Sequence, residues 1–382
     1  MRRSFICGLC LMAAAVLYVL TRTGAALTLL CAAVLFPVVS IILGTVSSRS
    51  INVYLTIPAS VHKKTPTRCA LVIENRSRIP AARAELILYV KNALTGGEEA
   101  LGPLAASALT KGKTELEFTF ETEHCGQFAF SADALYVYDF LCLRAIRRTV
   151  TIREKRVVPP DMFPLDVTLS GGDVLSGTGE VISVPKKGQD KTEPFQIRDY
   201  AEGDSPKQIH WRLTKKYGRY IVTDPSLELE HALLIVWDSG QLGANAPPEL
   251  PDALAEAAVS LCVELGENGI PYSVIWKNGE TGEIMLKDVG EKDDVFDVAT
   301  GLLGADGLSG VSLVPEFLKL LDGKRYPLIA YFSYSQPEEL AELESTGKVT
   351  AFVCGYEDIS VEGKAVAFTP DNYERVLREI TI

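Results

Sequence analysis

Two long apolar runs near the amino terminus constrain this sequence more than any other feature. Residues 4–20 and 25–46 contain no charged side chain, and each approaches the ~20 apolar residues that a helix needs to cross the hydrocarbon of a bilayer. Residues 21–24 separate them, so residues 1–50 are predicted to form a hairpin of two transmembrane helices. A cleaved signal peptide is the alternative, because Arg2 and Arg3 precede an apolar core, but the second run follows at once.

Basic residues around the two runs predict the orientation of the hairpin. Those on its outer sides are Arg2, Arg3, Arg49, Lys63 and Lys64. Only Arg22 lies in the connection. Positively charged flanks stay in the cytoplasm, so we expect both ends of the hairpin there, with the chain held in the cell inner membrane. Neither run carries a charged residue that would line an ion path, so ion conduction is not indicated.

Residues 51–153 change to short segments in which polar and apolar side chains alternate. The stretch from Glu115 to Phe120 shows the pattern most cleanly, since every second residue is apolar. Alternation with a period of two is typical of half-buried strands. We expect strands at residues 52–57, 68–74, 84–91, 115–121, 127–132 and 149–153. Such regular short strands indicate a β-sandwich-like domain, and because no part of it has catalytic spacing, a spacer or recognition module is predicted.

Residues 154–230 form a linker that contains the most distinctive stretch of the sequence. A turn is predicted at residues 203–206, and a strand at residues 220–223. Four charged side chains can form one hydrogen-bonded network: Arg198, Asp199, Asp204 and Arg212. One interpretation is that this segment fixes a long insertion to the rest of the domain. The other is that it forms an active or ligand site from His210 and the carboxylates.

The same stretch resembles the signature of the domain of unknown function 58 family. The matching residues are Arg198, Asp199, Tyr200, Gly203, Asp204, Ile209, His210, Trp211, Lys215, Gly218 and Arg219. A second element of that family, Asp-Pro-Phe/Leu-Gly-Leu, is similar to Asp139-Phe140-Leu141, although its Pro and Gly are missing here. The resemblance implies two membrane helices, a β-rich segment and a von Willebrand A-like domain. It also implies a MoxR-type AAA ATPase as the protein partner.

Residues 231–382 alternate between predicted strands and helices. Buried strands are expected at residues 232–237, 272–276, 328–332 and 349–353, and helices at 250–268, 337–344 and 372–380. Continuous apolar runs are typical of parallel strands that are covered on both faces, so this segment is predicted to be a doubly wound α/β domain. No Gly-x-Gly-x-x-Gly or Walker sequence follows any of these strands, so no cofactor is expected.

The strand edge where a von Willebrand A domain binds a divalent cation lacks most of its ligands in this sequence. The resemblance implies a site of Asp-x-Ser-x-Ser, a Thr and a later Asp, since hard cations prefer oxygen ligands. The positions that correspond to Asp, Ser, Ser, Thr and Asp hold Asp238, Gly240, Leu242, Val311 and Tyr334. We interpret Asp238 and Ser239 as a vestigial metal-site loop that binds no metal.

The distribution of charge narrows the class of function. Residues 231–382 hold 10 basic and 26 acidic residues, so this part repels phosphate backbones and nucleic-acid binding is not expected. We therefore predict a non-catalytic, membrane-anchored scaffold that presents its A-like domain to a basic protein partner. One alternative is a membrane-associated enzyme with an unrecognised site, for which Asp238, Ser239 and His210 are the candidates. The other is a metal-dependent, ligand-binding A domain.

Overall fold

The computed structural model describes residues 2–169, 182–183, 197–199, 221–223, 233–240, 242, 246–305, 311–321, 326–335, 339–356 and 364–382. The short pieces between 182 and 223 are described by their strand pairing alone. The chain divides into two compact units, Met1–Pro159 and Pro160–Ile382. The expected end of the sandwich at residue 153 differs from this division because the last strand of the first unit continues to Val158.

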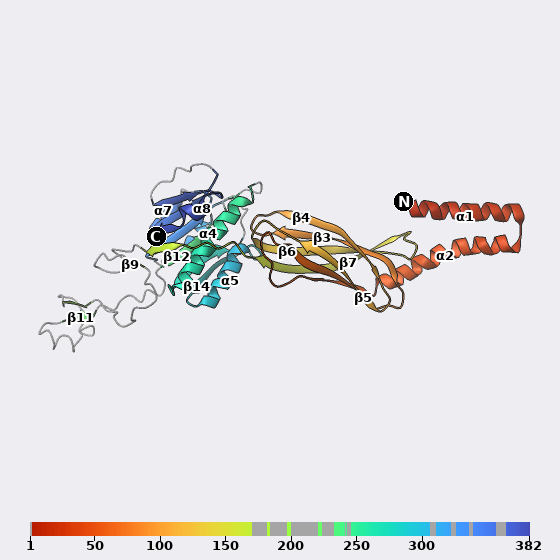
Figure 1. Ribbon diagram of the computed structural model, residues 1–382, viewed down its shortest axis with the longest axis horizontal. Helices are drawn as coiled ribbons and strands as arrows, with labels where there is room; N and C mark the ends of the chain where they lie inside the picture. Colours follow the sequence, from red (N-terminus) through yellow and green to blue (C-terminus); the bar gives the residue numbers. More distant parts are fainter. Residues whose placement is uncertain are drawn as a thin grey trace. The chain divides into compact units, whose positions relative to one another are not determined.

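Two helices open the first unit, α1 (Arg2–Thr21) and α2 (Gly24–Ser48), and they lie side by side (Figure 1). Thr23 caps the start of α2, since its side chain accepts a hydrogen bond from the N–H of Ala26. α2 is long and apolar enough to cross a membrane, with a mean hydropathy of 2.7. The described apolar part of α1, Phe5–Thr21, is shorter than a full span. One apolar N-terminal helix of the two expected thus suits a membrane anchor or a signal sequence.

Antiparallel strands in two sheets form the rest of this unit. They are β1 (Ile51–Thr56), β2 (Thr67–Asn75), β3 (Ala81–Asn92), β4 (Glu98–Ala108), β5 (Gly112–Phe120), β6 (Gly126–Tyr138) and β7 (Ala145–Val158). One sheet has the order β1-β2-β5 and the other β4-β3-β6-β7. A single apolar core joins the sheets, with Leu71 and Ile73 from β2 and Phe130 and Leu135 from β6 fully buried in it. The expected β-rich, sandwich-like domain is therefore present.

Strand β4 is absent from the sequence-based prediction. It contains Gly102, Pro103 and four alanines, which are residue types with low strand propensity. β4 lies at the edge of its sheet, where proline is tolerated because one side of the strand makes no ladder bonds. Pairing with β3, rather than its own composition, makes this segment a strand.

Hydrogen bonds fix the C-terminal end of α2 to the sandwich. The Ser47 hydroxyl donates to the carbonyl of Ile79 at 2.9 Å. The Arg148 guanidinium donates to the carbonyls of Ser48 and Ile51. The last carbonyls of a helix have no partner within it, so a side chain of β7 satisfies one that α2 leaves open. Two residues separate α2 from β1, and the helix leads directly into the first sheet.

A second contact lies further back along α2, at the turn between β6 and β7. Asp139 in this turn is fully buried. Its carboxylate accepts hydrogen bonds from the Ser40 hydroxyl at 2.7 Å and from the N–H groups of Leu141 at 3.1 Å and Arg144 at 2.6 Å. A Cβ added to Gly44 would lie 2.8 Å from Cα and Cβ of Asp139. The turn therefore packs directly on the backbone of α2.

The second unit is built on a six-stranded sheet with the order β14-β13-β12-β15-β16-β17. The strands are β12 (Leu233–Trp237), β13 (Tyr272–Lys277), β14 (Ile284–Val289), β15 (Leu328–Ser333), β16 (Lys348–Cys354) and β17 (Ala365–Phe368). All neighbours are parallel except β13 and β14. The four central strands occupy the segments that their apolar runs predict, whereas the two edge strands, β14 and β17, were not predicted.

Helices cover both faces of this sheet (Figure 1). They are α4 (Glu249–Glu267), α5 (Lys292–Leu303), α6 (Val314–Leu321), α7 (Leu340–Glu344) and α8 (Tyr373–Val376). On one face, Phe317 of α6 shares a buried cluster with Val236 of β12 and Val353 of β16. Successive side chains of a strand point to opposite faces, and Cys354 contacts the carbonyl of Leu250 in α4 on the other face. The α/β layering matches the expectation for this segment.

A small sheet of the order β18-β8-β9 joins the two ends of the second unit. β8 (Asp166–Leu169) pairs in parallel with β18 (Glu379–Thr381) and antiparallel with β9 (Ile182–Ser183). The helix expected at residues 372–380 is wrong beyond its first turn, because α8 ends at Val376 and the chain then extends as β18. The ladder bonds to β8 favour the strand over the helix that the local pattern predicts.

The close approach at Gly44 provides a test of the junction between α2 and the sandwich. Gly44→Ala places a methyl group 2.8 Å from Asp139, so the turn must move although alanine is the better helix former. Overpacking of about 1–3 kcal/mol should speed amide hydrogen exchange at Leu141 and Arg144 by about tenfold in the full-length protein in detergent. Gly8→Ala is the matched control, because no atom lies within 4 Å of its added Cβ. Unchanged exchange in Gly44→Ala would contradict the packing.

Candidate functional site

The carboxyl ends of β12 and β15 are where a ligand site is expected in this sheet. The order of the strands reverses between these two neighbours, and open α/β sheets bind ligands at such a switch point. Asp238 and Ser239 follow β12, and Ser333 ends β15. The N–H of Asp238 donates to the carbonyl of Phe332 at 2.9 Å, so the two strand ends are in contact.

Asp238 lies at the centre of this edge, and protein donors surround its carboxylate. The side chain is fully buried. Oδ2 accepts hydrogen bonds from the hydroxyls of Tyr331 at 2.7 Å and Ser312 at 3.1 Å. Oδ1 accepts from the N–H of Gly240 at 3.3 Å, and the N–H of Leu313 lies 3.3 Å from Oδ1 and 3.2 Å from Oδ2. Groups of the protein itself therefore occupy both oxygens.

These bonds place the carboxylate at the N-terminus of α6. Leu313 directly precedes this helix, and the Ser312 hydroxyl also accepts a hydrogen bond from the N–H of Val314 at 3.3 Å. Free N–H groups and the helix dipole make a helix N-terminus favourable for an anion. Asp238 therefore fastens the loop before α6 to the end of β12, which is a structural role.

Burial and hydrogen bonding act on Asp238 in opposite directions. Removal from water raises the pKa of this carboxyl above its usual value, and the four donors lower it by a smaller amount. Burial and the neighbouring carboxylate also raise the pKa of Tyr331. Tyr331 consequently keeps its proton and remains a hydrogen-bond donor to Asp238.

The residues expected at the two serine positions of the A-domain pattern, Gly240 and Leu242, offer backbone or apolar groups at this edge. Gly240 donates its N–H to Asp238 and accepts a hydrogen bond from the N–H of Val311 at 3.0 Å. Leu242 is buried. Val311, expected at the threonine position, is exposed, and the hydroxyl that reaches Asp238 comes from the next residue, Ser312. Residues 311–313 thus lie beside Asp238, and the hydroxyl that contacts its carboxylate belongs to Ser312 rather than to residue 311.

Two further residues define what β15 contributes. The Ser333 hydroxyl donates to the carbonyl of Ser335 at 2.7 Å, so it closes the loop after the strand. The side chain of β15 that contacts Asp238 is Tyr331, although the sequence pattern indicates only that this residue belongs to an apolar run. A tyrosine inside a buried strand needs a partner for its hydroxyl. The presence of Tyr331 in an apolar run therefore indicates that a polar group lies near this strand.

The signature residues of the linker are described only in part. β10 (Ile197–Asp199) pairs antiparallel with β11 (Ile221–Thr223), with Arg198 opposite Val222. The strand expected at residues 220–223 is therefore confirmed over three residues, and the two ends of this stretch lie together. The other signature positions, Tyr200, Gly203, Asp204, Ile209, His210, Trp211, Lys215, Gly218 and Arg219, lie outside the described residues. The network or site expected from them remains a prediction.

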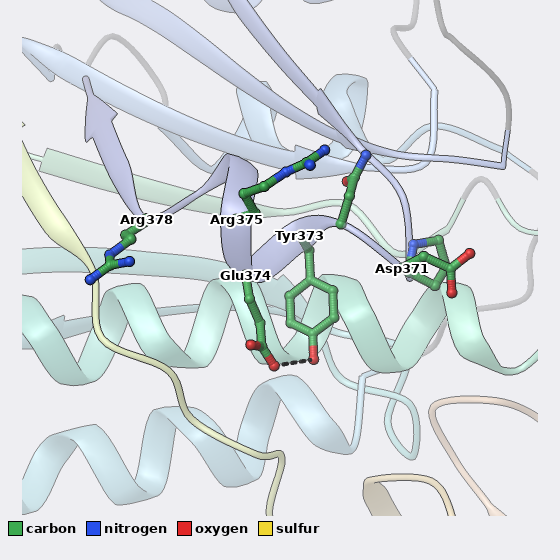
Figure 2. Close-up of a pocket in the computed structure, with 7 residues that line it drawn as sticks. Asp371, Tyr373, Glu374, Arg375 and Arg378 are labelled. Atoms are coloured by element: carbon green, nitrogen blue, oxygen red, sulfur yellow. Dashed lines mark hydrogen bonds between the residues drawn. The ribbon is translucent and has the colours of Figure 1, made fainter.

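A concave region around α8 contains charged side chains that point in different directions (Figure 2). This groove of about 740 Å³ is lined by residues of the segment 370–378. The Tyr373 hydroxyl donates to Glu256, while Arg375 and Arg378 point to different sides of the groove (Figure 2). A substrate site needs groups that converge on one point, so this groove does not indicate catalysis. In the part of the chain that the structure describes, no cluster of three or more His, Cys, Asp or Glu residues could hold a metal ion.

Comparisons with known proteins leave the family open. No protein-family model and no curated protein matches the chain. A CARDB domain from Pyrococcus furiosus, solved with di-metal ions, is 13% identical over 28% of this chain and 86% of its own, with a TM-score of 0.21. An exo-β-N-acetylglucosaminidase from Vibrio harveyi is 10% identical over 87% of this chain and 56% of its own, with a TM-score of 0.20. Similarity this low carries no argument about fold or function.

The hydrogen bond from Tyr331 to Asp238 can be removed with little change of shape. Tyr331→Phe leaves a fully buried carboxylate with one donor fewer, which should lower the free energy of unfolding by about 1–3 kcal/mol. Urea unfolding of the full-length protein, followed by tryptophan fluorescence, measures it because all three tryptophans lie in the second unit. Tyr356→Phe is the control, since its exposed hydroxyl bonds Glu249 and its loss should matter by less than about 0.5 kcal/mol. Equal effects would contradict the assigned role.

The raised pKa of Asp238 predicts a dependence of stability on pH. A carboxyl whose pKa is raised by folding favours its protonated form, so its contribution to stability is complete at low pH and is lost as pH rises from the unfolded to the folded pKa. The free energy of unfolding of the wild type relative to Asp238→Asn should therefore fall as the pH rises above the pKa of an unfolded aspartate, about 3.9. Asp294→Asn is the control of opposite sign, because hydrogen bonding to Glu291 lowers the pKa of Asp294. The same slope for both variants would refute the assignment.

Proposed function

We propose that this chain is a non-catalytic scaffold of the domain of unknown function 58 type, anchored in the cell inner membrane. In this proposal α1 and α2 both span the bilayer, and the sandwich and the second unit lie in the cytoplasm. The second unit acts as a degenerate von Willebrand A-like domain that presents a docking surface to protein partners. A MoxR-type AAA ATPase is the partner that the sequence resemblance implies.

The surroundings of Asp238 are the observation that carries this proposal. A divalent cation at the strand edge would need several oxygens with free lone pairs. The groups that face Asp238 are instead N–H and O–H donors, and they use both carboxylate oxygens. Such an arrangement favours a fixed loop over an exchangeable ligand site, and it leaves the surface of the unit to recognise proteins by shape and charge.

The junction of α2 supports an anchor over a cleaved signal peptide. Only 11% of the 18-residue apolar window of α2 is buried within the protein, whereas the core helix of a soluble protein would be mostly buried. Ser40 and Ser47 nevertheless donate to the sandwich at 2.7 and 2.9 Å. A signal peptide is removed from the mature chain, so contacts of this kind favour a helix that remains part of the fold.

The charge of the second unit supports a basic partner. Its acidic excess includes exposed side chains on helices, such as Glu342 and Glu344 of α7. Complementary charge accelerates the encounter of two proteins, and salt weakens this attraction.

An enzyme would need a nucleophile beside a base. The histidines that the structure describes, His62 and His124, both belong to the first unit.

Binding to a purified MoxR-type ATPase tests the proposal. We expect the full-length chain in detergent to bind it with an affinity that falls as salt rises. Replacing both glutamates of α7, by Glu342→Lys with Glu344→Lys, should weaken binding about tenfold at low salt. Glu98→Lys with Glu99→Lys in β4 is the matched control, because it makes the same change of charge on exposed residues of the sandwich.

Three experimental outcomes would count against the proposed scaffold function. Absence of association at physiological salt would remove the ATPase as partner. Heat of Mg²⁺ binding in a calorimetric titration of the wild type, lost in Asp238→Asn, would favour the metal-dependent A domain. Turnover of a small substrate that depends on Asp238 would favour the enzyme.

A further inference from the structure

The turn between β6 and β7 lies beside a part of α2 that is well inside the apolar run of this helix. Asp139 accepts a hydrogen bond from the Ser40 hydroxyl, and the N–H of Leu141 donates to the same hydroxyl at 3.1 Å. Ser40 precedes Val46, where the apolar run ends, by six positions, which is about 9 Å along a helix. A membrane-spanning α2 therefore holds this turn below the level at which the helix leaves the hydrocarbon.

The side chains at the tip of the turn are apolar. Phe140 is 60% exposed. Leu141 and Leu143 line an apolar groove of about 630 Å³ together with Phe36 and Pro37 of α2 and neighbouring residues of both helices. Lipid chains cover apolar surface that is continuous with an inserted helix, so the tip and the groove suit a bilayer better than water.

The carboxylate and several backbone groups of the turn have partners within the protein. The carboxylate of Asp139 accepts three hydrogen bonds. The N–H of Asp139 donates to the carbonyl of Arg144 at 3.3 Å, and the N–H of Cys142 donates to the carbonyl of Asp139 at 2.8 Å. Backbone and carboxylates that enter the apolar part of a bilayer must be satisfied in this way.

Exposed basic side chains gather at the same end of the sandwich. They are Arg49, Arg78, Lys111, Arg144 and Arg147. Strand register brings their segments together, because Ile51 lies opposite Asn75, which in turn lies opposite Gly112. Two acidic side chains of this region are paired with other arginines, Glu74 with Arg76 at 3.3 Å and Glu85 with Arg83 at 2.7 Å, and so do not offset them. Clusters of Lys and Arg next to a membrane helix attract anionic lipid headgroups.

We propose that this end of the sandwich is a membrane-docking face whose partner is a phospholipid bilayer. The tip of Phe140, Leu141 and Leu143 inserts at the boundary between hydrocarbon and headgroups, and the basic side chains bind anionic headgroups. This inference rests on the proposed anchor, since a membrane-spanning α2 brings the face to the lipid. The face and α2 together hold the sandwich against the bilayer in one orientation.

Tryptophan at the tip measures contact with lipid. Phe140→Trp keeps an aromatic side chain there, and Tyr89→Trp places the same probe on β3. Tyr89 lies opposite Ser131 of β6, and Ser131 is about 26 Å from Asp139 along that strand. Full-length variants are placed in nanodiscs of phosphatidylcholine and phosphatidylglycerol with brominated acyl chains, which quench tryptophan on contact. After subtraction of the wild-type signal, the probe at residue 140 should be quenched at least about twofold more than the probe at residue 89.

Leu35→Trp separates this inference from the anchor, because Leu35 lies on α2 and is 60% exposed. Quenching at residues 35 and 140 but not at 89 supports both proposals. Quenching at residue 35 without quenching at 140 overturns the docking face and leaves the anchor intact. No quenching at either residue overturns both, and quenching at residue 89 equal to that at 140 overturns the assignment to this end of the sandwich.

The headgroup contact is tested by removing two charges in the Phe140→Trp background. Arg144→Gln with Arg147→Gln should abolish the extra quenching that anionic discs give over discs of phosphatidylcholine alone. Arg153→Gln with Lys155→Gln is the matched control, since it removes two exposed basic side chains further along the same strand. Equal quenching in all these variants, or no extra quenching with anionic lipid, would overturn the basic part of the face.

Discussion

The buried carboxylate of Asp139 is the interaction on which the organisation of the first unit depends. It joins a turn of the sandwich to the side of α2, because Ser40 donates to it and Gly44 leaves room for its backbone. A buried carboxylate is tolerated when donors replace its water, and three do so here. The Ser40 contact lies eight residues before Ser48 at the end of the helix, so α2 is held at two levels and does not pivot on its connection to β1.

Asp238 applies the same chemistry at the edge of the second sheet. Each aspartate follows a strand, and each accepts an N–H two residues ahead, from Leu141 in one case and from Gly240 in the other. The remaining donors differ, and so do the consequences. At Asp139 they attach a helix, whereas at Asp238 the Tyr331 hydroxyl and the start of α6 close a strand edge. A buried aspartate at a strand end is therefore weak evidence for a ligand site until its donors are known.

The sequence predicts those elements whose pattern is local. The central strands of both units and helix α4 follow from their own periodicity, and so do the edge strands β1, β5 and β7, whereas the edge strands β4, β14 and β17 have no such pattern and depend on a neighbour. The candidate site is predictable only as far as Asp238, since Ser312 and Tyr331 reach it from 74 and 93 residues away. Family resemblance singled out Asp139, but its partner Ser40, 99 residues away, was hidden within an apolar run.

In the proposed function the closed strand edge binds no ligand, so partners are recognised by the surfaces of the protein, and charge determines which surface binds which partner. Residues 1–50 contain four arginines and no acidic residue, whereas residues 231–382 hold 26 acidic and 10 basic residues. An anionic bilayer that attracts the basic end of the sandwich repels the acidic unit. In our proposal this repulsion keeps the second unit away from the lipid and leaves its surface available to basic proteins. One chain can then bind an anionic bilayer and a basic protein at different surfaces without any exchangeable ligand.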